Sequence, residues 1–187
     1  MHSVIKGRQW GERRPSGRLV ALVLGVAMSG LLGQAAGVHS QSIVGPGEGR
    51  ALQVLGSTIT VKIDGAQTAG RYAVIEEVSP VDGGPPLHVH HHEDELFYVQ
   101  EGEVEFQLGE QRFRALAGSV AFLPKDVPHT FRNVGATSSK VLVVIIPARF
   151  VGFFEDIHAL AQPTPEQFEA LEKQYEVLHF LPPPKGN

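Results

Sequence analysis

A histidine-rich segment has the residue types and spacing of a metal site. It runs from His88 to Glu95 with the sequence HVHHHEDE. In a β-strand, side chains two positions apart point to the same face and lie about 6.6 Å apart along it. His88 and His90 can therefore share one ion, while His91 points to the other face. Glu95 precedes the next strand-forming run and can return to the same ion as an anionic ligand.

The fourth ligand must come from elsewhere in the fold, and His129 is the candidate. Pro124 and Pro128 bracket a tight turn, and His129 begins the strand that follows it. The chain has no cysteine, which excludes thiolate ligands and disulfides. Imidazole and carboxylate ligands suit one divalent transition metal: iron, manganese, nickel, cobalt, copper or zinc. Two alternatives stay open, an exposed histidine tract that binds metal adventitiously and a metal-free pocket.

The rest of the sequence up to Pro147 predicts one all-β domain around these residues. Short strand-forming runs are separated by turn-forming pairs such as Asp64-Gly65 and Gly109-Glu110, as in an antiparallel sandwich or barrel. There is no internal repeat, so a single barrel is expected. The predicted strands are Leu55–Ile63, Arg71–Val78, His88–His90, Leu96–Gln100, Val104–Leu108, Gln111–Ala115, Val120–Leu123, His129–Asn133 and Val141–Pro147.

After Pro147 the hydrophobic period becomes helical. Gly152–Leu160 and Pro165–Val177 are the predicted helices, the second with Thr164 as its N-cap. Its apolar stripe of Phe168, Leu171 and Tyr175 is predicted to pack against the outside of the barrel. The expected organisation is a signal peptide (1–41), a flexible N-terminal tail (42–54), the β-barrel (55–147) and a C-terminal helical extension (148–187).

Two motifs resemble those of the cupin family. The first is His88-x-His90, four residues, Glu95, six residues and Gly102. The second is Gly118, five residues, Pro124 and then His129 and Asn133. The resemblance implies an all-β, single-domain cupin-type antiparallel β-barrel (jelly roll) with a short C-terminal helical extension. It also implies that the metal is held inside the barrel by His88, His90, Glu95 and His129.

Two positions depart from the family pattern. Asp126 stands where the family has a glycine, and Asp82 stands where another is usual, with Gly83 one step later. Aspartate tolerates left-handed turn conformations, so a small cost in the turn is expected and none at the metal. Asn133 is expected to tie down a turn, and Lys125 to be a solvated loop residue.

His91 and His92 are expected at the surface or beside the ligands rather than among them. The predicted pocket is apolar and suits a small planar phenolic or enol substrate. Its inward-facing candidates are Phe97, Val99, Phe106, Phe122 and Phe131, which are equally suited to plain filling of the barrel, the commoner case in small barrels.

By resemblance to flavonol (quercetin-type) dioxygenases, the leading hypothesis is a metal-dependent oxygenase in which Glu95 is both metal ligand and catalytic proton acceptor. One alternative is a non-catalytic exported cupin that binds or senses a small ligand. The other is a sugar-derivative isomerase, which is weakened by the lack of basic residues near the predicted pocket.

The N-terminal segment has the composition of a signal peptide. Met1–Arg18 is basic, Leu19–Met28 is apolar and small residues follow, with cleavage expected within Ala35–Ser42. The pair Arg13-Arg14 indicates twin-arginine export, and the protein is expected in the periplasm or outside the cell. An uncleaved membrane anchor is the alternative.

Charge is unevenly distributed along the chain. Of 16 basic and 20 acidic residues, five basic and one acidic lie within the first 41 positions, which leaves a net charge of −8 for the remainder. This negatively charged remainder repels phosphate backbones, so no nucleic-acid partner is expected. The expected partner is a small-molecule substrate, with no stable membrane span after processing. The oligomeric state is open, with a homodimer as a candidate.

Overall fold

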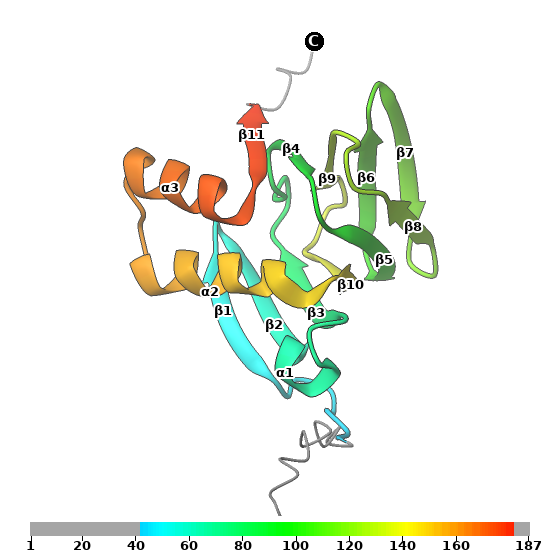
Figure 1. Cartoon of the computed structure of the whole chain (residues 1–187). Coiled ribbons are helices and arrows are strands. Elements are labelled where there is room, and N and C mark those ends of the chain that lie inside the picture. Colours follow the sequence, from blue (N-terminus) through cyan, green and yellow to red (C-terminus); the bar gives the residue numbers. More distant parts are fainter. Residues whose placement is uncertain (1–41, 182–187) are drawn as a thin grey trace, which may run out of the picture. The chain divides into compact units, whose positions relative to one another are not determined.

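The computed structural model describes residues 42–181, which form two antiparallel β-sheets and a helical C-terminal segment (Figure 1). The predicted signal peptide lies outside the described residues. In the six-stranded sheet the order is β1-β2-β3-β10-β5-β8, and in the five-stranded sheet it is β11-β4-β9-β6-β7. The first sheet contains β1 (Arg50–Val54), β2 (Ser57–Ile63), β3 (Ala73–Ser79), β5 (Asp94–Glu101), β8 (Val120–Leu123) and β10 (Ser139–Ile146). The second contains β4 (Leu87–His90), β6 (Glu103–Leu108), β7 (Gln111–Leu116), β9 (His129–Asn133) and β11 (Val177–Leu181).

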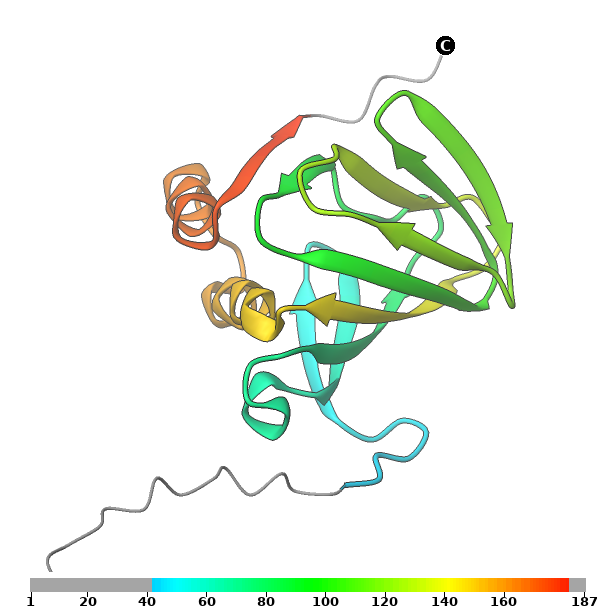
Figure 2. The ribbon, with the colours of Figure 1, turned by 45° about the vertical axis from the view of Figure 1, so that its right-hand side comes forward.

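The two sheets pack face to face around a common core (Figure 2). Alternate residues along β3 and β10 are buried, as expected for strands with one face toward the interior. Aromatic rings join the sheets, because Phe97 of β5 lies 5.4 Å from both Phe106 of β6 and Phe131 of β9, measured between ring centroids. The predicted all-β barrel with its short helical extension is confirmed.

The first strand begins earlier than the sequence predicts. Arg50–Val54 forms β1 and pairs with β2, although this stretch was expected to belong to a flexible tail. The glycine- and proline-rich composition ends at Gly49, and from there Leu52 and Val54 alternate into the core. The hairpin turn is Leu55-Gly56, both with positive φ, at the point where the strand Leu55–Ile63 was predicted to begin.

The C-terminal segment consists of a 3-10 turn (Ala148–Phe150), α2 (Val151–Leu160), α3 (Pro165–Tyr175) and β11. Thr164 caps α3 as predicted, in a capping box with Gln167. The apolar stripe of α3 contacts α2, with Phe168 and Tyr175 both within 6 Å of the Phe153 ring. The chain then adds β11 beside β4, a strand that was not predicted and that begins at Val177, where the predicted helix was expected to end.

The loops around the second sheet need unusual backbone conformations. Asp126 has φ +62°, the left-handed conformation expected where the family has a glycine. Gly84 has φ +147°, and a Cβ atom there would lie 2.1 Å from the carbonyl oxygen of Phe131. Glycine is therefore required at 84 for close approach of this loop to β9. A shorter helix, α1 (Gly65–Thr68), joins β2 and β3.

Candidate metal centre

Strand geometry brings the four predicted ligands together. His88 and His90 lie two positions apart on β4, and both side chains are buried. His88 is the direct cross-strand partner of His129 in β9. Glu95 reaches them from β5 in the facing sheet. All four side chains are buried, and each offers one ligand atom within 4.8 Å of the others. Two sheets thus hold the group from opposite sides.

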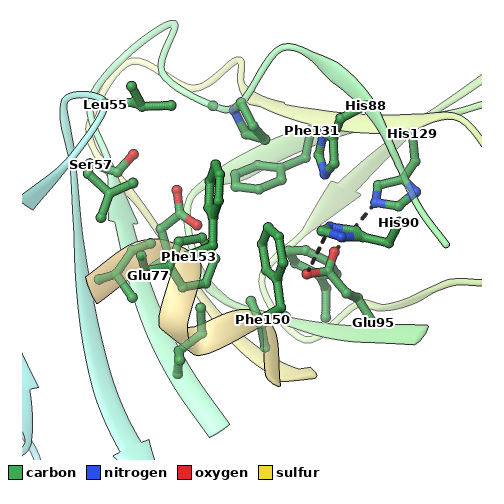
Figure 3. A pocket seen from close by; sticks show the side chains of 18 residues that line it. Leu55, Ser57, Glu77, His88, His90, Glu95, His129, Phe131, Phe150 and Phe153 are labelled. Carbon is green, nitrogen blue, oxygen red and sulfur yellow. Dashed lines mark ion pairs between the residues drawn. The ribbon is translucent and has the colours of Figure 1, made fainter. Parts of the chain in front are cut away.

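The carboxylate of Glu95 lies between two imidazoles (Figure 3). Its Oε1 is 3.7 Å from His90 Nε2, and its Oε2 is 3.5 Å from His129 Nε2. These distances exceed the usual length of a hydrogen bond. The atoms face a common point without bonding one another directly.

Hydrogen bonds from Nδ1 set the tautomers of His88 and His129. His88 Nδ1 is 2.8 Å from the carbonyl oxygen of Pro86, and His129 Nδ1 is 2.8 Å from that of Val127. A carbonyl oxygen only accepts, so each Nδ1 carries the proton and donates it. Each Nε2 is then the unprotonated nitrogen, which is the form that binds a metal.

Burial and mutual proximity set the charge of the group. Burial, together with the neighbouring His90 and His129, lowers the pKa of His88 to about 3, and burial also lowers the pKa of His90. Burial alone would raise the pKa of Glu95, but the adjacent histidines, His90 foremost, lower it to about 2. Neutral His88 and His90 therefore face an anionic carboxylate, an arrangement suited to a cation.

The buried atoms without partners fit a metal ion. Among the described residues, His90 Nε2 and His129 Nε2 are buried with no hydrogen-bond partner. An unsatisfied buried polar atom costs about 1–3 kcal/mol, so such atoms are rare unless something else binds them. A divalent ion would satisfy both nitrogens at once, and the donor set of nitrogen and carboxylate suits a transition metal. The described residues fit the predicted cofactor.

Glu93 is a buried carboxyl next to His90. It is 1% exposed, neither of its carboxylate oxygens has a hydrogen-bond partner, and its Oε2 lies 3.8 Å from His90 Nδ1. Burial raises its pKa. A small movement would let His90 Nδ1 donate to it, which would orient His90 as the two carbonyls orient the other rings. No role was predicted for Glu93, although its position in the histidine segment was a signal.

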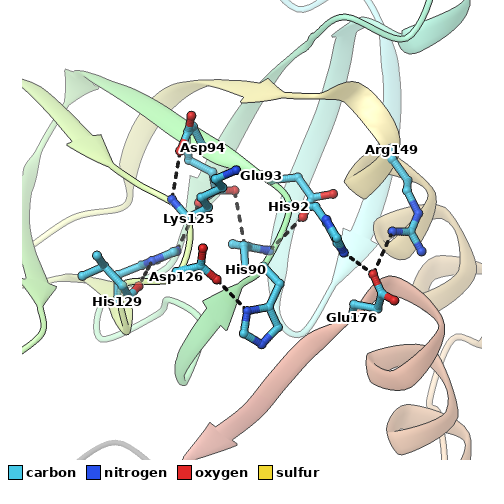
Figure 4. A network of polar contacts seen from close by, with 12 residues as sticks. His90, His92, Glu93, Asp94, Lys125, Asp126, His129, Arg149 and Glu176 are labelled. Carbon is cyan, nitrogen blue, oxygen red and sulfur yellow. Dashed lines mark hydrogen bonds and ion pairs between the residues drawn. The ribbon is translucent and has the colours of Figure 1, made fainter.

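The loop between β4 and β5, which contains His92 and Glu93, is held by contacts on two sides (Figure 4). His91 Nδ1 is 2.7 Å from Asp126 Oδ1, which links the loop to the turn before β9. His92 contacts Glu176, which also lies 3.6 Å from Arg149 in the C-terminal segment. Neither His91 nor His92 belongs to the buried ligand group, as expected.

Two further residues occupy their predicted places. The amide nitrogen of Asn133 donates to the carbonyl oxygens of Ser79, Pro80 and Thr137, at 2.9–3.1 Å. It therefore fixes a turn and lies outside the cavity lining. The Lys125 side chain is exposed, and its backbone N–H donates to Asp94.

A cavity opens from the ligand group into the barrel. Phe97 and Phe131 line it as predicted, whereas Val99 and Phe106 fill the core elsewhere. The prediction for Phe122 is wrong: this side chain is 56% exposed, because alternation along β8 turns Leu123 inward instead. The remaining aromatic wall consists of Phe150, Phe153 and Phe154 from the C-terminal segment.

Glu77 is a buried carboxyl of the cavity that was not predicted from the sequence. It lies on β3, is 8% exposed and lines the same cavity as the ligand group. Burial raises its pKa to about 7, and hydrogen bonds from Ser57 and Ser79 only partly oppose this shift. The signal was its phase, since Glu77 is two residues after Ile75 and four after Ala73 on the inward face.

Comparison with known proteins supports this fold. Residues 74–145 match the family model described as cupin domain. The chain is also 27% identical over 77 residues to the uncharacterized protein MJ1618 of Methanocaldococcus jannaschii, and the match covers 41% of this chain and 62% of that protein. The chain thus spans less than two thirds of this relative's length.

Solved structures agree with the family match. A predicted oxalate decarboxylase from Thermotoga maritima superposes with a TM-score of 0.52 at 22% identity, covering 57% of this chain and 99% of that one. KdgF from Halomonas sp. gives 0.52 at 17% identity, covering 58% and 94%. An RmlC-like cupin from Shewanella frigidimarina gives 0.51 at 17% identity, covering 59% and 94%. The barrel therefore has the cupin-type jelly-roll fold, with a buried histidine and glutamate group that could hold a metal.

Proposed function

We propose that this cupin binds one divalent transition metal through His88, His90, Glu95 and His129 and acts as an oxygenase on a small phenolic or enol substrate. The observation that carries the proposal is the position of the four buried ligands at one end of an aromatic-lined cavity. Four protein ligands leave open positions on a five- or six-coordinate ion. A redox-active metal bound there would supply the means to activate oxygen and to polarise a chelating substrate.

The residues of the chain would position the substrate and receive its proton. Phe131, Phe150 and Phe153 offer flat apolar surfaces to a planar ring, and the C-terminal segment shields it from water. Glu95 is ionised throughout the physiological pH range, because its pKa is lowered to about 2. It is therefore available as a proton acceptor for an acidic enol or phenol hydroxyl at the ligand group.

The same low pKa favours a second candidate, a non-catalytic cupin that binds or senses a small ligand. A general base works best when its pKa lies near the working pH, and Glu95 lies far below it. A carboxylate that only anchors the metal has no such requirement. The two candidates share the site and differ in turnover.

The experiment that separates them is oxygen uptake per bound metal ion for wild type and Glu95→Gln. Glutamine keeps the size of the side chain and a carbonyl oxygen for the metal, but removes the charge and the basicity. If Glu95 accepts the substrate proton, turnover per ion should fall on the order of 10²–10⁴-fold. Glu101→Gln is the matched control, because Glu101 lies on the same strand, 65% exposed and paired with Lys140.

Activity is scored per ion, because losing the anionic ligand also weakens metal binding. Equal rates for wild type and Glu95→Gln would remove the proton-acceptor role. Absence of uptake by metal-loaded wild type across a panel of flavonols, catechols and enols would favour the binding protein. In that case, ligand affinity should follow metal occupancy across the same variants.

A further inference from the structure

The cavity has a second polar end, remote from the ligand group. Glu77 accepts a hydrogen bond from Ser79 Oγ at 3.0 Å, and Ser79 Oγ lies 3.2 Å from Ser57 Oγ. All three side chains are buried, and Glu77 and Ser57 line the cavity. Figure 3 shows these two residues on the opposite side from His129, with Phe131 and Phe153 between them.

The chemistry of this end differs from that of the metal centre. No lysine or arginine is among the described residues that line the cavity, so the Glu77 carboxyl has no cation there to balance a charge. Burial raises its pKa to about 7. At neutral pH a substantial fraction of Glu77 therefore carries a proton, and the carboxyl can donate as well as accept a hydrogen bond.

These properties restrict the group that can bind there. An anionic group would face a carboxyl with no cation beside it. An apolar group would leave the hydroxyl of Ser57 and the carboxyl without a ligand partner at the cavity surface. A neutral hydroxyl can both donate to and accept from this pair. The aromatic walls between the two ends suit an apolar or planar body in the same ligand.

We propose that Glu77 and Ser57 form a second binding subsite, which recognises a neutral hydroxyl at the end of the ligand remote from the metal. The inference rests on the proposed function for the other end of the ligand, where a chelating hydroxy-ketone or phenol would meet the metal centre. The ligand class is therefore a hydroxylated enol or phenol with polar groups at both ends. Glu77 and Ser57 are specificity determinants in this arrangement.

Matched pairs of chelators test the subsite. Kojic acid and allomaltol share one chelating hydroxy-ketone and differ only by a hydroxyl at the opposite end of the ring. Kaempferol and galangin are a longer pair that differ by one hydroxyl on the pendant ring. Affinities of all four would be measured by calorimetry on metal-loaded protein, for wild type, Glu77→Leu, Ser57→Ala and Glu76→Gln. Glu76 neighbours Glu77 on β3 but faces outward, which makes it the matched control.

Wild type should bind the hydroxylated member of at least one pair about tenfold more tightly, as expected for a hydrogen bond to a buried polar group. Glu77→Leu should lose this preference, Ser57→Ala should reduce it and Glu76→Gln should keep it. Metal content per chain should be unchanged in all three variants, because none is a ligand. Ser57→Ala keeps the test valid if Glu77→Leu does not fold.

No preference in either wild-type pair, or an equal preference in wild type and in the folded Glu77 and Ser57 variants, would overturn the subsite. Failure of the metal proposal has another signature. In that case, all four compounds would bind equally before and after removal of metal by a chelating resin. The two failures are therefore distinguishable in one set of titrations.

Discussion

Glu77 and Glu95 lie in one cavity, yet their carboxyl groups have opposite pKa shifts. Histidines surround Glu95 and lower its pKa to about 2, despite its burial. Glu77 has hydroxyl partners and no cation, and burial raises its pKa to about 7. Opposed shifts in one cavity are typical of sites where the two groups have different roles. Here they separate an anionic candidate metal ligand from a group that can hold a proton.

The first prediction concerns the metal ligands. His129→Ala should reduce metal content well below one ion per chain and lower the melting temperature, because metal binding is linked to folding. His91→Ala is the control, since His91 is more than a third exposed and points to Asp126. Elemental analysis and thermal melts with and without added divalent ions measure both effects. Wild type that is not stabilised by any divalent ion would contradict the site.

The second prediction concerns Glu77 and pH. Its pKa is about 7 in the fold and 4.5 as its ordinary value, so the unfolded chain loses this proton at lower pH than the folded one. Folded-state stability should therefore fall as pH rises from about 4.5 to 7, by about 3 kcal/mol from this group alone. Below about 4.5 both states hold the proton and the cost is absent.

Glu77→Gln cannot ionise and should remove this pH dependence. The variant should gain stability relative to wild type as pH rises, and the gain should level off above pH 7. Urea unfolding of metal-free wild type and variant at pH 5 and pH 8 measures the difference between their free energies of unfolding. The titration of the ligand group contributes to both proteins and largely cancels in this difference. A difference between the two proteins that does not change with pH would exclude a raised pKa at Glu77.

At the scale of elements, the C-terminal segment forms part of the cavity as well as a cover. Phe150 and Phe153 stack 4.9 Å apart, and Phe150 also contacts the His90 ring edge-on at 4.2 Å. The second helix, α3, packs on α2, and β11 joins the sheet beside β4. The segment thus closes the barrel on the side of the metal centre.

The sequence predicted most elements, because their signals are local. The predicted bounds of β8 and β9 match those observed, and the ligand strand β4 differs by one residue. The phase of β8 was not predictable in the same way, because Val120–Leu123 is apolar throughout and alternation cannot be read from it. Phe122 was therefore assigned to the wrong face.

Long-range packing accounts for what the sequence missed at the site. Helical periodicity shows which residues share a face, but not which surface that face meets. Nothing local to Phe150 or Phe153 connects them with His90, which is some 60 positions earlier in the chain. The grouping of the four candidate ligands was predictable, because their spacing is a motif, whereas the aromatic wall depends on where the segment folds back.

The third prediction tests this wall. Phe153 is 2% exposed, so Phe153→Ala should destabilise the fold by about 3–5 kcal/mol, through lost burial and the space left behind. Phe113→Ala is the matched control: Phe113 is 50% exposed on β7, and its loss should cost less than about 1 kcal/mol. Urea unfolding measures both. Similar losses for the two variants would show that the segment is not packed as described.

At the scale of the molecule, residues 1–41 differ from the rest of the chain in charge and hydrophobicity. The basic and apolar signals lie in residues 1–41, and the remainder carries a net charge of −8. Within residues 42–181, no helix combines the length and hydrophobicity needed to cross a membrane. Export and processing are therefore proposed from the sequence alone. A homodimer likewise stays a prediction, which light scattering of the purified barrel would measure.

The last prediction is that the mature protein begins between Ala36 and Gly45 and is exported. The apolar run from Leu19 is short for a span, since crossing a bilayer takes about 20 predominantly apolar residues, and small residues follow it as in a cleavage zone. The first described strand begins at Arg50, so cleavage before Gly45 leaves the barrel complete. N-terminal sequencing of protein from the periplasm and medium measures the cleavage point. A chain lacking Met1–Gln34 should be soluble and melt at the same temperature as the processed protein when both carry equal metal. Recovery of the intact chain from membranes would instead establish an anchor, and replacing Arg13-Arg14 with lysines should block export only if the twin-arginine route is used.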